Sequence, residues 1–397
     1  MTRTREETMA PSDPVGAATH LNPYPYYAEL RARDPLVFDP GLKMWVAAQA
    51  GAVSEVLRSA HCRVRPVLEP VPHAIAGTAA GAVFGQLVRM NDGGGHEAGK
   101  RAIEHGLNGV DLGGLEALAV EQAKALGDVH RIDEPARLGD WAFDVPVVCI
   151  ARLLGWPAES AVQASRWMRD FVACLSPLST AEQLAAASDA AKELRQRMHG
   201  LLAAQARPAD LVQAIRQGDW HSPDALVANL IGLLSQTHDA TAGLIGNSIV
   251  ALIQRPELLE RLRAAPSLVP AFVREVGRFD PPVQNTRRFV AEPTRVCGVD
   301  LPPGATILVV LAAASRDPAL HHDAEVLNLE RDGAELIGFG AGRHACPGQR
   351  IALAIAAGAV AHLVQRTGAL NAQAIRWTYR PSANARIPLF ITKKELP

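Results

Sequence analysis

The residues with the clearest chemical potential lie in a glycine-rich segment near the C-terminus, Leu336–Ile351, which reads LIGFGAGRHACPGQRI. Cys346 in this segment is followed by Pro347, and a predicted helix begins just after Gly348. Proline fits the first turn of a helix, so we expect the cysteine to lie at a helix N-terminus. The dipole and free N–H groups at that end stabilise a thiolate, the form of sulfur that ligates iron. The segment therefore predicts a thiolate metal ligand; the alternative is a helix-capping turn around a buried free thiol.

The other four cysteines have no such surroundings. Cys62, Cys149, Cys174 and Cys297 form no CxxC pair, and the total of five is odd. We therefore expect them to pack as small apolar side chains rather than to form disulfides. This usage of cysteine is typical of a reducing, cytoplasmic location.

The segment around Cys346 resembles the heme-binding signature of the cytochrome P450 family. It has the form Phe339-x-x-Gly342-x-His344-x-Cys346-x-Gly348, and a chance match at five spaced positions is improbable. The resemblance implies that Cys346 ligates the iron of heme b. It also implies that Phe339, His344 and Gly348 contact this cofactor.

A charged motif further upstream extends the resemblance. Glu275 and Arg278 look like the Glu-x-x-Arg pair of the family's K helix, and residues three apart share one face of a helix. In the family these two side chains pair with a later arginine, for which Arg331 is the candidate. The resemblance implies a structural role for all three residues.

The resemblance also implies partners for the two heme propionates, since a buried carboxylate needs cationic neighbours. The candidates are Arg288, His344, His96 and Lys100. His96 and Lys100 lie four residues apart on one predicted helical face within Asn91–Arg101, and the family usually has arginine in place of Lys100. Taken singly, each of these basic residues is also typical of a solvated surface charge.

A long periodic apolar segment, Pro223–Ile253, predicts a helix that crosses the core. It contains the sequence SQTHDAT at Ser235–Thr241, where the family usually reads (Ala/Gly)-Gly-x-(Asp/Glu)-Thr-Thr. Asp239 matches the acid of that motif. Ala240 stands where the family has the threonine that supports proton delivery to dioxygen, so this chain departs from the pattern at a catalytic position.

Nearby polar residues could compensate for this missing hydroxyl. Thr237 and Gln236 lie three and four residues before Ala240, so they share its face, whereas Thr241 lies about 100° further round. Alternatively, these three polar residues only satisfy a helix bulge in the core. We expect either substrate-assisted protonation or an oxidation without oxygen rebound, such as radical coupling. His238 is expected to face away from the heme.

By resemblance, Val283, Gln284 and Asn285 line the substrate pocket together with Gln236. Their polar groups predict a small to mid-sized substrate that carries amide or hydroxyl groups. The alternative is that the polar side chains cap local turns.

The elements that must position these residues are mostly helical. The chain has 397 residues, of which 48% are hydrophobic. Its net charge of −1 argues against nucleic acid as a partner, because phosphate binding needs concentrated positive charge. No apolar run reaches the ~18 residues that a membrane span needs. We expect a mainly α fold with a small β region. The resemblance implies a single cytochrome P450-like domain over residues 22–397, after a flexible N-terminal segment, 1–21. Further predicted helices are Ala181–Ala204, Pro266–Arg278 and Gln349–Gln365, and predicted strands are Trp45–Ala47, Arg287–Ala291, Thr294–Val299, Thr306–Leu311 and Ile387–Ile391.

Together these features imply a monomeric, cytoplasmic heme-thiolate monooxygenase of secondary metabolism that uses dioxygen and electrons from a separate ferredoxin. The electron donor is expected on the Cys346 face, where Arg343, Arg350 and Arg101 give a basic patch. Two alternatives stay open. One is oxidative coupling or peroxide-driven oxidation without oxygen insertion, and the other is a catalytically silent heme protein that recruits partners.

Overall fold

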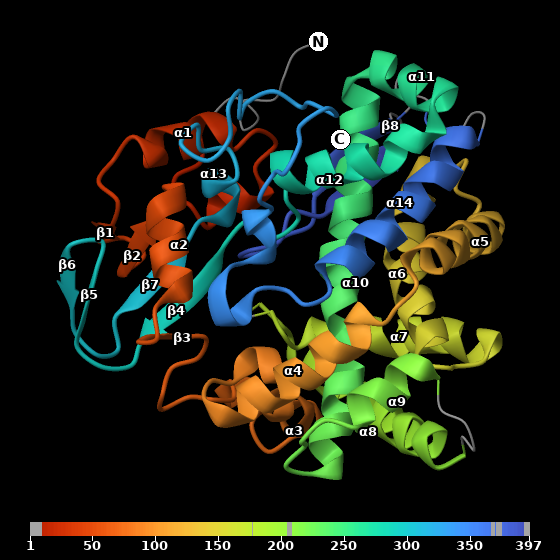
Figure 1. The fold of residues 1–397 in the computed structure, drawn as a ribbon, viewed down its shortest axis with the longest axis horizontal. Helices are drawn as coiled ribbons and strands as arrows, with labels where there is room; N and C mark the ends of the chain where they lie inside the picture. The colour runs from red at the N-terminus through yellow and green to blue at the C-terminus, as the bar shows by residue number, and fades with distance from the viewer. Residues whose placement is uncertain (1–9, 177, 205–208, 367–369, 371–374, 393–397) are drawn as a thin grey trace.

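Helices dominate the computed structural model, which describes residues 10–176, 178–204, 209–366, 370 and 375–392. The long helix α10 runs through the middle of the molecule, with a small β region on one side and α5, α6 and α7 on the other (Figure 1). The expected mainly α fold with a small β region is confirmed. The helices are α1 Tyr24–Arg31, α2 Ala50–Arg58, α3 Ala79–Gln86, α4 Gly94–Asn108, α5 Leu112–His130, α6 Leu138–Leu153, α7 Ala158–Ala173, α8 Ala181–Ala204, α9 Asp210–Arg216, α10 Pro223–Gln254, α11 Pro256–Ala264, α12 Val269–Phe279, α13 Leu311–Ala314 and α14 Gln349–Gln365.

The strands of the described residues form one five-stranded sheet and two hairpins. The larger sheet has the order β1-β2-β7-β4-β3, in which β2 and β7 are parallel and the other neighbours antiparallel. The hairpins pair β5 with β6 and β8 with β9. The bounds are β1 Val37–Asp39, β2 Met44–Ala47, β3 Cys62–Arg63, β4 Thr286–Val290, β5 Thr294–Val296, β6 Val299–Leu301, β7 Thr306–Val309, β8 Ile375–Tyr379 and β9 Pro388–Thr392.

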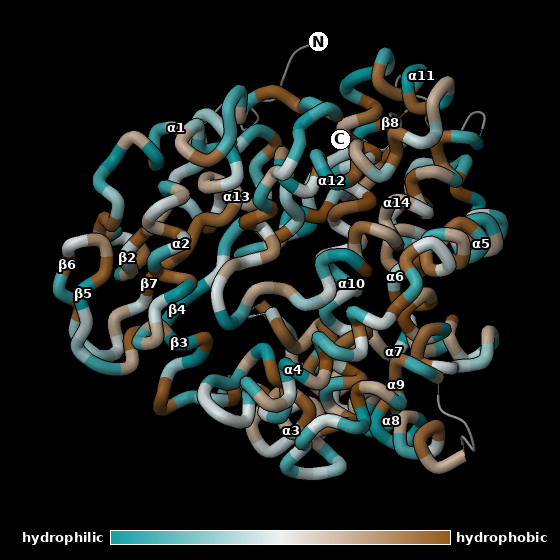
Figure 2. The backbone as a smooth tube through the Cα atoms, viewed as in Figure 1, coloured by the Kyte–Doolittle hydropathy of each residue, from teal (hydrophilic) through white to brown (hydrophobic). Residues whose placement is uncertain are grey.

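Helix α10 forms where local signals and apolar periodicity agree. The Ser222 hydroxyl accepts a hydrogen bond from the N–H of Ala225 at 3.1 Å, and Pro223 occupies the first helical position. The helix has 32 residues, so it spans about 48 Å. Hydrophobic stretches gather around α6, α10 and α14 in the interior, while the outer turns carry most of the hydrophilic residues (Figure 2).

Helix α14, which follows the Cys346 segment, is fixed to the core by its close contact with α5. A Cβ atom at Gly358 would lie 2.6 Å from the carbonyl oxygen of Glu116, so only glycine permits this approach. The segment before α14 is therefore held by a rigid helix.

Part of the N-terminal segment expected to be flexible, 1–21, packs against the rest of the fold. Residues 1–9 lie outside the described residues, but Ala17 and Ala18 are fully buried in a 3-10 turn. Arg386 donates to the carbonyl oxygens of His20 and Leu21, the latter at 3.1 Å. Ala17, Ala18 and the backbone of His20 and Leu21 therefore contact the folded part of the chain, while the flexibility of the segment stays a prediction.

Some predicted boundaries also differ from the structure. The segment expected as one strand, Thr294–Val299, is a hairpin, because Cys297 (φ 49°) and Gly298 (φ 78°) form a tight turn. The helix expected from Pro266 begins as α12 at Val269, after a 3-10 turn. Among the described residues, none of the helices is both long and apolar enough to cross a membrane.

Candidate active site

The Cys346 loop is built from two 3-10 turns, η7 (Ile337–Phe339) and η8 (Gly342–His344), that precede α14. The N–H of Cys346 donates to the carbonyl oxygen of Phe339 at 2.8 Å, which closes the loop. Gly340 and Gly342 adopt φ values of 76° and 66°, in the left-handed region that favours glycine. The loop therefore presents the cysteine side chain from a fixed backbone.

The thiol of Cys346 is exposed although protein surrounds it. Burial raises the pKa of this thiol, while the backbone N–H of Gly348 and the charges of Lys100 and Arg89 lower it. A thiol that is accessible to solvent, yet has its pKa raised by the surrounding protein, lines an interior space rather than the outer surface. The N–H of Gly348 at the helix N-terminus lowers this pKa, as we expected, but burial outweighs it; metal coordination would deprotonate the thiol.

The remaining cysteines have different surroundings. Cys62, Cys149 and Cys174 are buried, and burial raises the pKa of Cys149 to about 12 and that of Cys174 to about 11. Cys297 is half-buried in the β5–β6 turn, where burial and the Glu55 carboxylate raise its pKa to about 12. These values keep the thiols protonated, so Cys346 is distinct in both exposure and setting.

Two of the expected propionate partners lie together at one edge of the loop. The rings of His96 and His344 are 4.1 Å apart, and Nε2 of His344 lies 2.9 Å from Oδ1 of Asp92. Desolvation and the charge of His344 lower the pKa of His96 to about 4. His96 is therefore neutral at pH 7 in this arrangement.

The other two candidates approach the same edge from different elements. Lys100 on α4 donates to the carbonyl oxygens of Ala345, at 2.9 Å, and Arg343. Arg288 on β4 is buried and lies within the electrostatic field of Asp92. The structure thus brings together His96, His344, Lys100 and Arg288.

These residues fit a heme. Nε of Arg288 and Nδ1 of His96 are buried and have no hydrogen-bond partner among the described residues. Nε of Arg288 is a buried donor, which is unfavourable unless a ligand supplies an acceptor, and a propionate carboxylate is such an acceptor. Nε2 of the neutral His96 ring donates to the carbonyl oxygen of Arg343 at 3.1 Å, so Nδ1 is an acceptor. The exposed thiol of Cys346 would supply the iron ligand that the same cofactor needs.

One stretch of α10 is less buried than the rest and carries Gln236, Asp239 and Ala240. Gln236 is exposed in the middle of a helix that is otherwise largely buried, and its Nε2 donates to the carbonyl oxygen of Gly232 at 3.0 Å. A carbonyl can only accept, so the NH2 group must occupy that position, and the amide oxygen of Gln236 makes no hydrogen bond to any residue that the structure describes. Gln236 therefore offers an acceptor to whatever binds opposite it.

Asp239 is held by two neighbours that the sequence reasoning missed. Its Oδ1 lies 2.8 Å from Nδ1 of His238, and its Oδ2 lies 2.6 Å from Nη2 of Arg380. Desolvation raises the pKa of Asp239, but the hydrogen bonds from these two side chains outweigh it, and the net shift is downward. Arg380 is 141 residues away in sequence, so no local pattern signals it.

The structure does not bring Thr237 and Thr241 to the open face. Both are buried, and their Oγ1 atoms lie 3.0 Å apart, so one hydroxyl donates a hydrogen bond to the other. Their expected contribution at the site of the missing hydroxyl is therefore not supported. Gln236 is the polar residue that remains beside Ala240.

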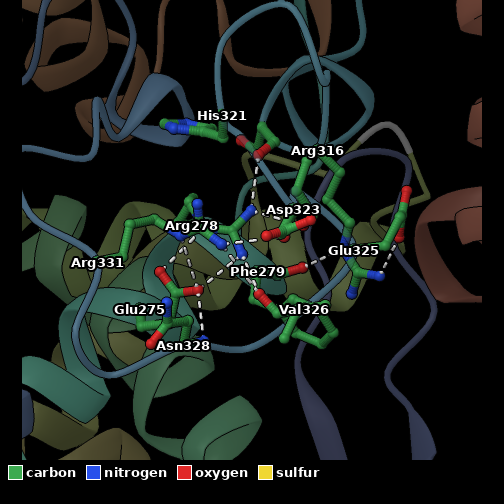
Figure 3. Close-up of polar contacts among 12 residues, drawn as sticks. Glu275, Arg278, Phe279, Arg316, His321, Asp323, Glu325, Val326, Asn328 and Arg331 are labelled. Carbon is green, nitrogen blue, oxygen red and sulfur yellow. Dashed lines mark hydrogen bonds and ion pairs between the residues drawn. The ribbon is translucent and has the colours of Figure 1, made fainter.

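The predicted ion-pair motif forms a buried network (Figure 3). Nε and Nη2 of Arg278 lie 2.9 and 2.7 Å from the two carboxylate oxygens of Glu275. Nε of Arg331 and the N–H of Asn328 reach Oε1 of Glu275 at 3.3 and 3.0 Å. This network fixes the long loop before the Cys346 segment to α12. Further N–H groups of Arg278 donate to the carbonyl oxygens of Ser315, Ala324 and Val326.

The structure corrects two of the expected substrate contacts. Gln284 is fully buried and bonds to the Tyr27 hydroxyl at 3.0 Å and to the Pro281 carbonyl at 2.7 Å. Asn285 is also buried and donates to the carbonyl of Ala383 at 3.0 Å. Both amides are used in joining chain segments, because buried polar groups must be satisfied. Val283 is half-buried in a bridge to Ala385, and its expected contact stays a prediction.

The comparisons with known proteins agree with this geometry. Residues 179–367 match the family model described as Cytochrome P450. The chain is 26% identical over 369 residues to the biotin biosynthesis cytochrome P450 of Bacillus subtilis, covering 91% of this chain and 93% of that protein. It is 30% identical over 351 residues to the vitamin D(3) 25-hydroxylase of Pseudonocardia autotrophica, covering 83% of each. The crystal structure of P450BioI in complex with hexadec-9Z-enoic acid ligated acyl carrier protein superimposes with a TM-score of 0.79 at 24% identity, covering 94% of this chain and 97% of that chain. The chain therefore belongs to the cytochrome P450 family, the heme-thiolate monooxygenases whose members bind heme b through a cysteine.

Proposed function

We propose that this monooxygenase oxidises a small to mid-sized polar organic molecule of secondary metabolism, with electrons from a ferredoxin. The observation that carries the proposal is the free amide oxygen of Gln236, exposed on α10 beside Ala240. An acceptor at this position favours substrates with a hydroxyl or amide donor, since a polar group left unpaired in an enclosed site is costly. The relatives include a vitamin D(3) 25-hydroxylase and a cytochrome P450 of biotin biosynthesis, which supports oxygen insertion into a metabolite.

Bound heme supplies the activation of dioxygen, and Cys346, Arg288, His96, His344 and Lys100 are the residues that would hold it. The chain's own contribution to proton delivery starts at Asp239. Its carboxylate is kept ionised by Arg380 and His238. Ala240 offers no hydroxyl between this acid and the site. A substrate donor held by Gln236 therefore takes the place of the side-chain alcohol in ordering water for proton transfer.

A second candidate function follows from Ala240. Oxidative coupling and peroxide-driven oxidation depend less on controlled proton delivery, and Ala240 removes the alcohol that serves this purpose in the family. The two functions differ in their oxidant. Turnover with ferredoxin, reductant and dioxygen supports the monooxygenase, whereas equal product from hydrogen peroxide alone supports the alternative.

The electron donor is proposed to bind on the Cys346 face. Arg101, Arg343 and Arg350 are exposed around this loop, so they offer positive charge to an acidic ferredoxin. Replacing the three with glutamate should slow reduction of the heme strongly at low salt, with a smaller difference at high salt because exposed charges are screened.

The ligand assignment has a direct spectroscopic test. The ferrous, carbon monoxide-bound protein should show the band of thiolate-ligated heme, and Cys346→Ser should lose it. Cys297→Ser is the matched control, because it removes a half-buried thiol away from the loop and should keep the band. A thiolate band that survives in Cys346→Ser would show that another residue is the ligand.

A further inference from the structure

A cation that the sequence reasoning missed lies at the site. Arg89 is the middle residue of the 3-10 turn η4 (Val88–Met90), between α3 and α4. Its side chain is exposed, yet desolvation by surrounding protein lowers its pKa. The charges that act on it belong to Asp239 on α10 and to Cys346. Arg89 therefore projects into the enclosed space between the central helix and the cysteine loop, and not to the outer surface.

The turn that carries Arg89 is fixed against the same stretch of α10. The N–H of Val88 donates to Oδ1 of Asn229 at 2.9 Å, and Nδ2 of Asn229 donates to the carbonyl of Gln86 at 2.8 Å. A Cβ at Gly232 would lie 2.9 Å from Cδ2 of Leu87. Gly232 is one helical turn before Gln236. Arg89 thus starts from a rigid turn close to the exposed amide.

Arg89 has no short-range counter-ion. Within the part of the chain that the structure describes, its guanidinium makes no hydrogen bond or ion pair. Asp239 is the carboxylate whose charge acts on Arg89. Its Oδ1 already accepts from His238 and its Oδ2 from Arg380. A partly desolvated guanidinium without a partner is unfavourable, so an anion bound there would be stabilised.

The heme propionates are the less favoured partners of this cation. Asp92, at the propionate edge, lies 2.9 Å from Nε2 of His344, and the charge of Asp92 acts on Arg288. The charges that act on Arg89 are instead those of Asp239 and Cys346. The propionate edge thus has its own cation, Arg288, whereas the turn that carries Arg89 is hydrogen-bonded to Asn229 of α10.

We propose that Arg89 binds a carboxylate of the substrate and so selects anionic molecules. This inference deepens the proposed function and rests on it, since it assigns a substrate class to the same site. The planar guanidinium offers two parallel N–H donors that match a carboxylate. The substrate would then carry a carboxylate for Arg89 and a hydroxyl or amide donor for the free oxygen of Gln236.

The experiment uses probes that bind the iron regardless of how well they fit the pocket. An imidazole nitrogen ligates heme iron and changes its absorption spectrum, so imidazole carrying an alkyl carboxylate can be titrated against the matched alkyl alcohol. A series of chain lengths is measured on the heme-loaded wild type, Arg89→Gln and Arg216→Gln. Arg216, an exposed residue at the end of α9, is the control for loss of one positive charge.

At the best chain length, the carboxylate should bind about tenfold more tightly than the alcohol in wild type and in Arg216→Gln. This preference should vanish in Arg89→Gln, while plain imidazole binds all three proteins alike. Equal binding of acid and alcohol at every length, or a preference that survives in Arg89→Gln, would overturn the proposal. A selective loss of heme from Arg89→Gln would also overturn it, because Arg89 would then pair with a propionate. A wild type without any imidazole response would refute the proposed heme function itself.

Discussion

Arg380 and Asp239 join the C-terminal hairpin to the central helix, since Nη2 of the arginine lies 2.6 Å from Oδ2 of the acid. The guanidinium of Arg380 also lies over the Phe143 ring, 5.2 Å from its centroid, and Phe143 stacks on His238 at 4.7 Å. Asp239 is thus oriented by two donors that one aromatic ring holds in place. The sequence motif shows only the acid, whereas the ionisation of Asp239 depends on its ion pair with Arg380.

Arg380→Gln should move the acid limb of the activity profile to higher pH. The pKa of Asp239 is lowered although desolvation raises it, because hydrogen bonds from His238 and Arg380 favour the carboxylate. Removing Arg380 leaves the desolvation and raises that pKa. An enzyme that needs this carboxylate ionised then loses activity at a higher pH than wild type. The measurement is product formed per reductant consumed as the pH falls from neutral.

Arg380→Lys keeps the charge and should retain most of the wild-type acid limb. The pair is partly exposed, so high salt should reduce the difference between the glutamine variant and wild type. Identical acid limbs in all three proteins would mean that Asp239 does not control proton delivery.

Ala240→Thr should reduce the reductant lost as hydrogen peroxide when no donor-bearing substrate is bound. The substitution returns a hydroxyl four residues after Gln236, on the face that lacks one. A positioned proton donor changes such rates by large factors, so we expect about a tenfold drop in peroxide released per reductant. With a substrate that supplies its own donor, wild type and variant should couple similarly.

Thr241→Val is the matched control, because its hydroxyl faces Thr237 at 3.0 Å instead of the site. It should leave peroxide release unchanged. Poor coupling of the native substrate, equal in wild type and Ala240→Thr, would contradict substrate assistance.

Glu275→Gln should strongly destabilise the fold, although it changes only the charge of the side chain and hardly its size. Glu275 accepts from Arg278 and Arg331, and both it and Arg278 are buried. Neutralising the carboxylate leaves buried cations unpaired, which costs about 3–5 kcal/mol. The free energy of unfolding in urea measures this loss.

Glu330→Gln provides the comparison, since Glu330 pairs with Arg261 at 3.1 Å on the surface. An exposed pair contributes at most about 1 kcal/mol. Equal losses in the two variants would show that the buried network adds no stability.

Strong periodicity made the long helices predictable. The expected Ala181–Ala204 and Gln349–Gln365 agree with α8 and α14, and Pro223–Ile253 differs from α10 by one residue. In each case apolar spacing and end signals agree. The short strands β1, β3 and β8 were missed, because two to five residues carry too little pattern to stand out from loops.

Side-chain partners across the fold were harder to predict than motifs. Cys346, Glu275 and Asp239 stand in recognisable local sequences, but Arg380 and Arg89 do not. Their positions depend on how β8 and η4 pack against α10, which no sequence spacing encodes. Gln284 shows the converse error, since a polar residue near the site is used to satisfy buried backbone.

Gly342→Ala should destabilise the Cys346 loop through both backbone strain and overpacking. Gly333→Ala is the control that has the backbone strain alone. Both glycines have positive φ, 66° and 63°, so alanine costs about 1–2 kcal/mol of backbone strain at either position. A Cβ at Gly342 would also lie 2.9 Å from the carbonyl oxygen of Leu57 on α2, whereas one at Gly333 meets nothing within 4 Å. Overpacking adds about 1–3 kcal/mol, so Gly342→Ala should lose more stability and retain less heme than Gly333→Ala. Urea unfolding and the heme-to-protein absorbance ratio measure both effects. Equal losses would mean that α2 yields to the added methyl group and that its contact with the loop does not hold the cysteine in place.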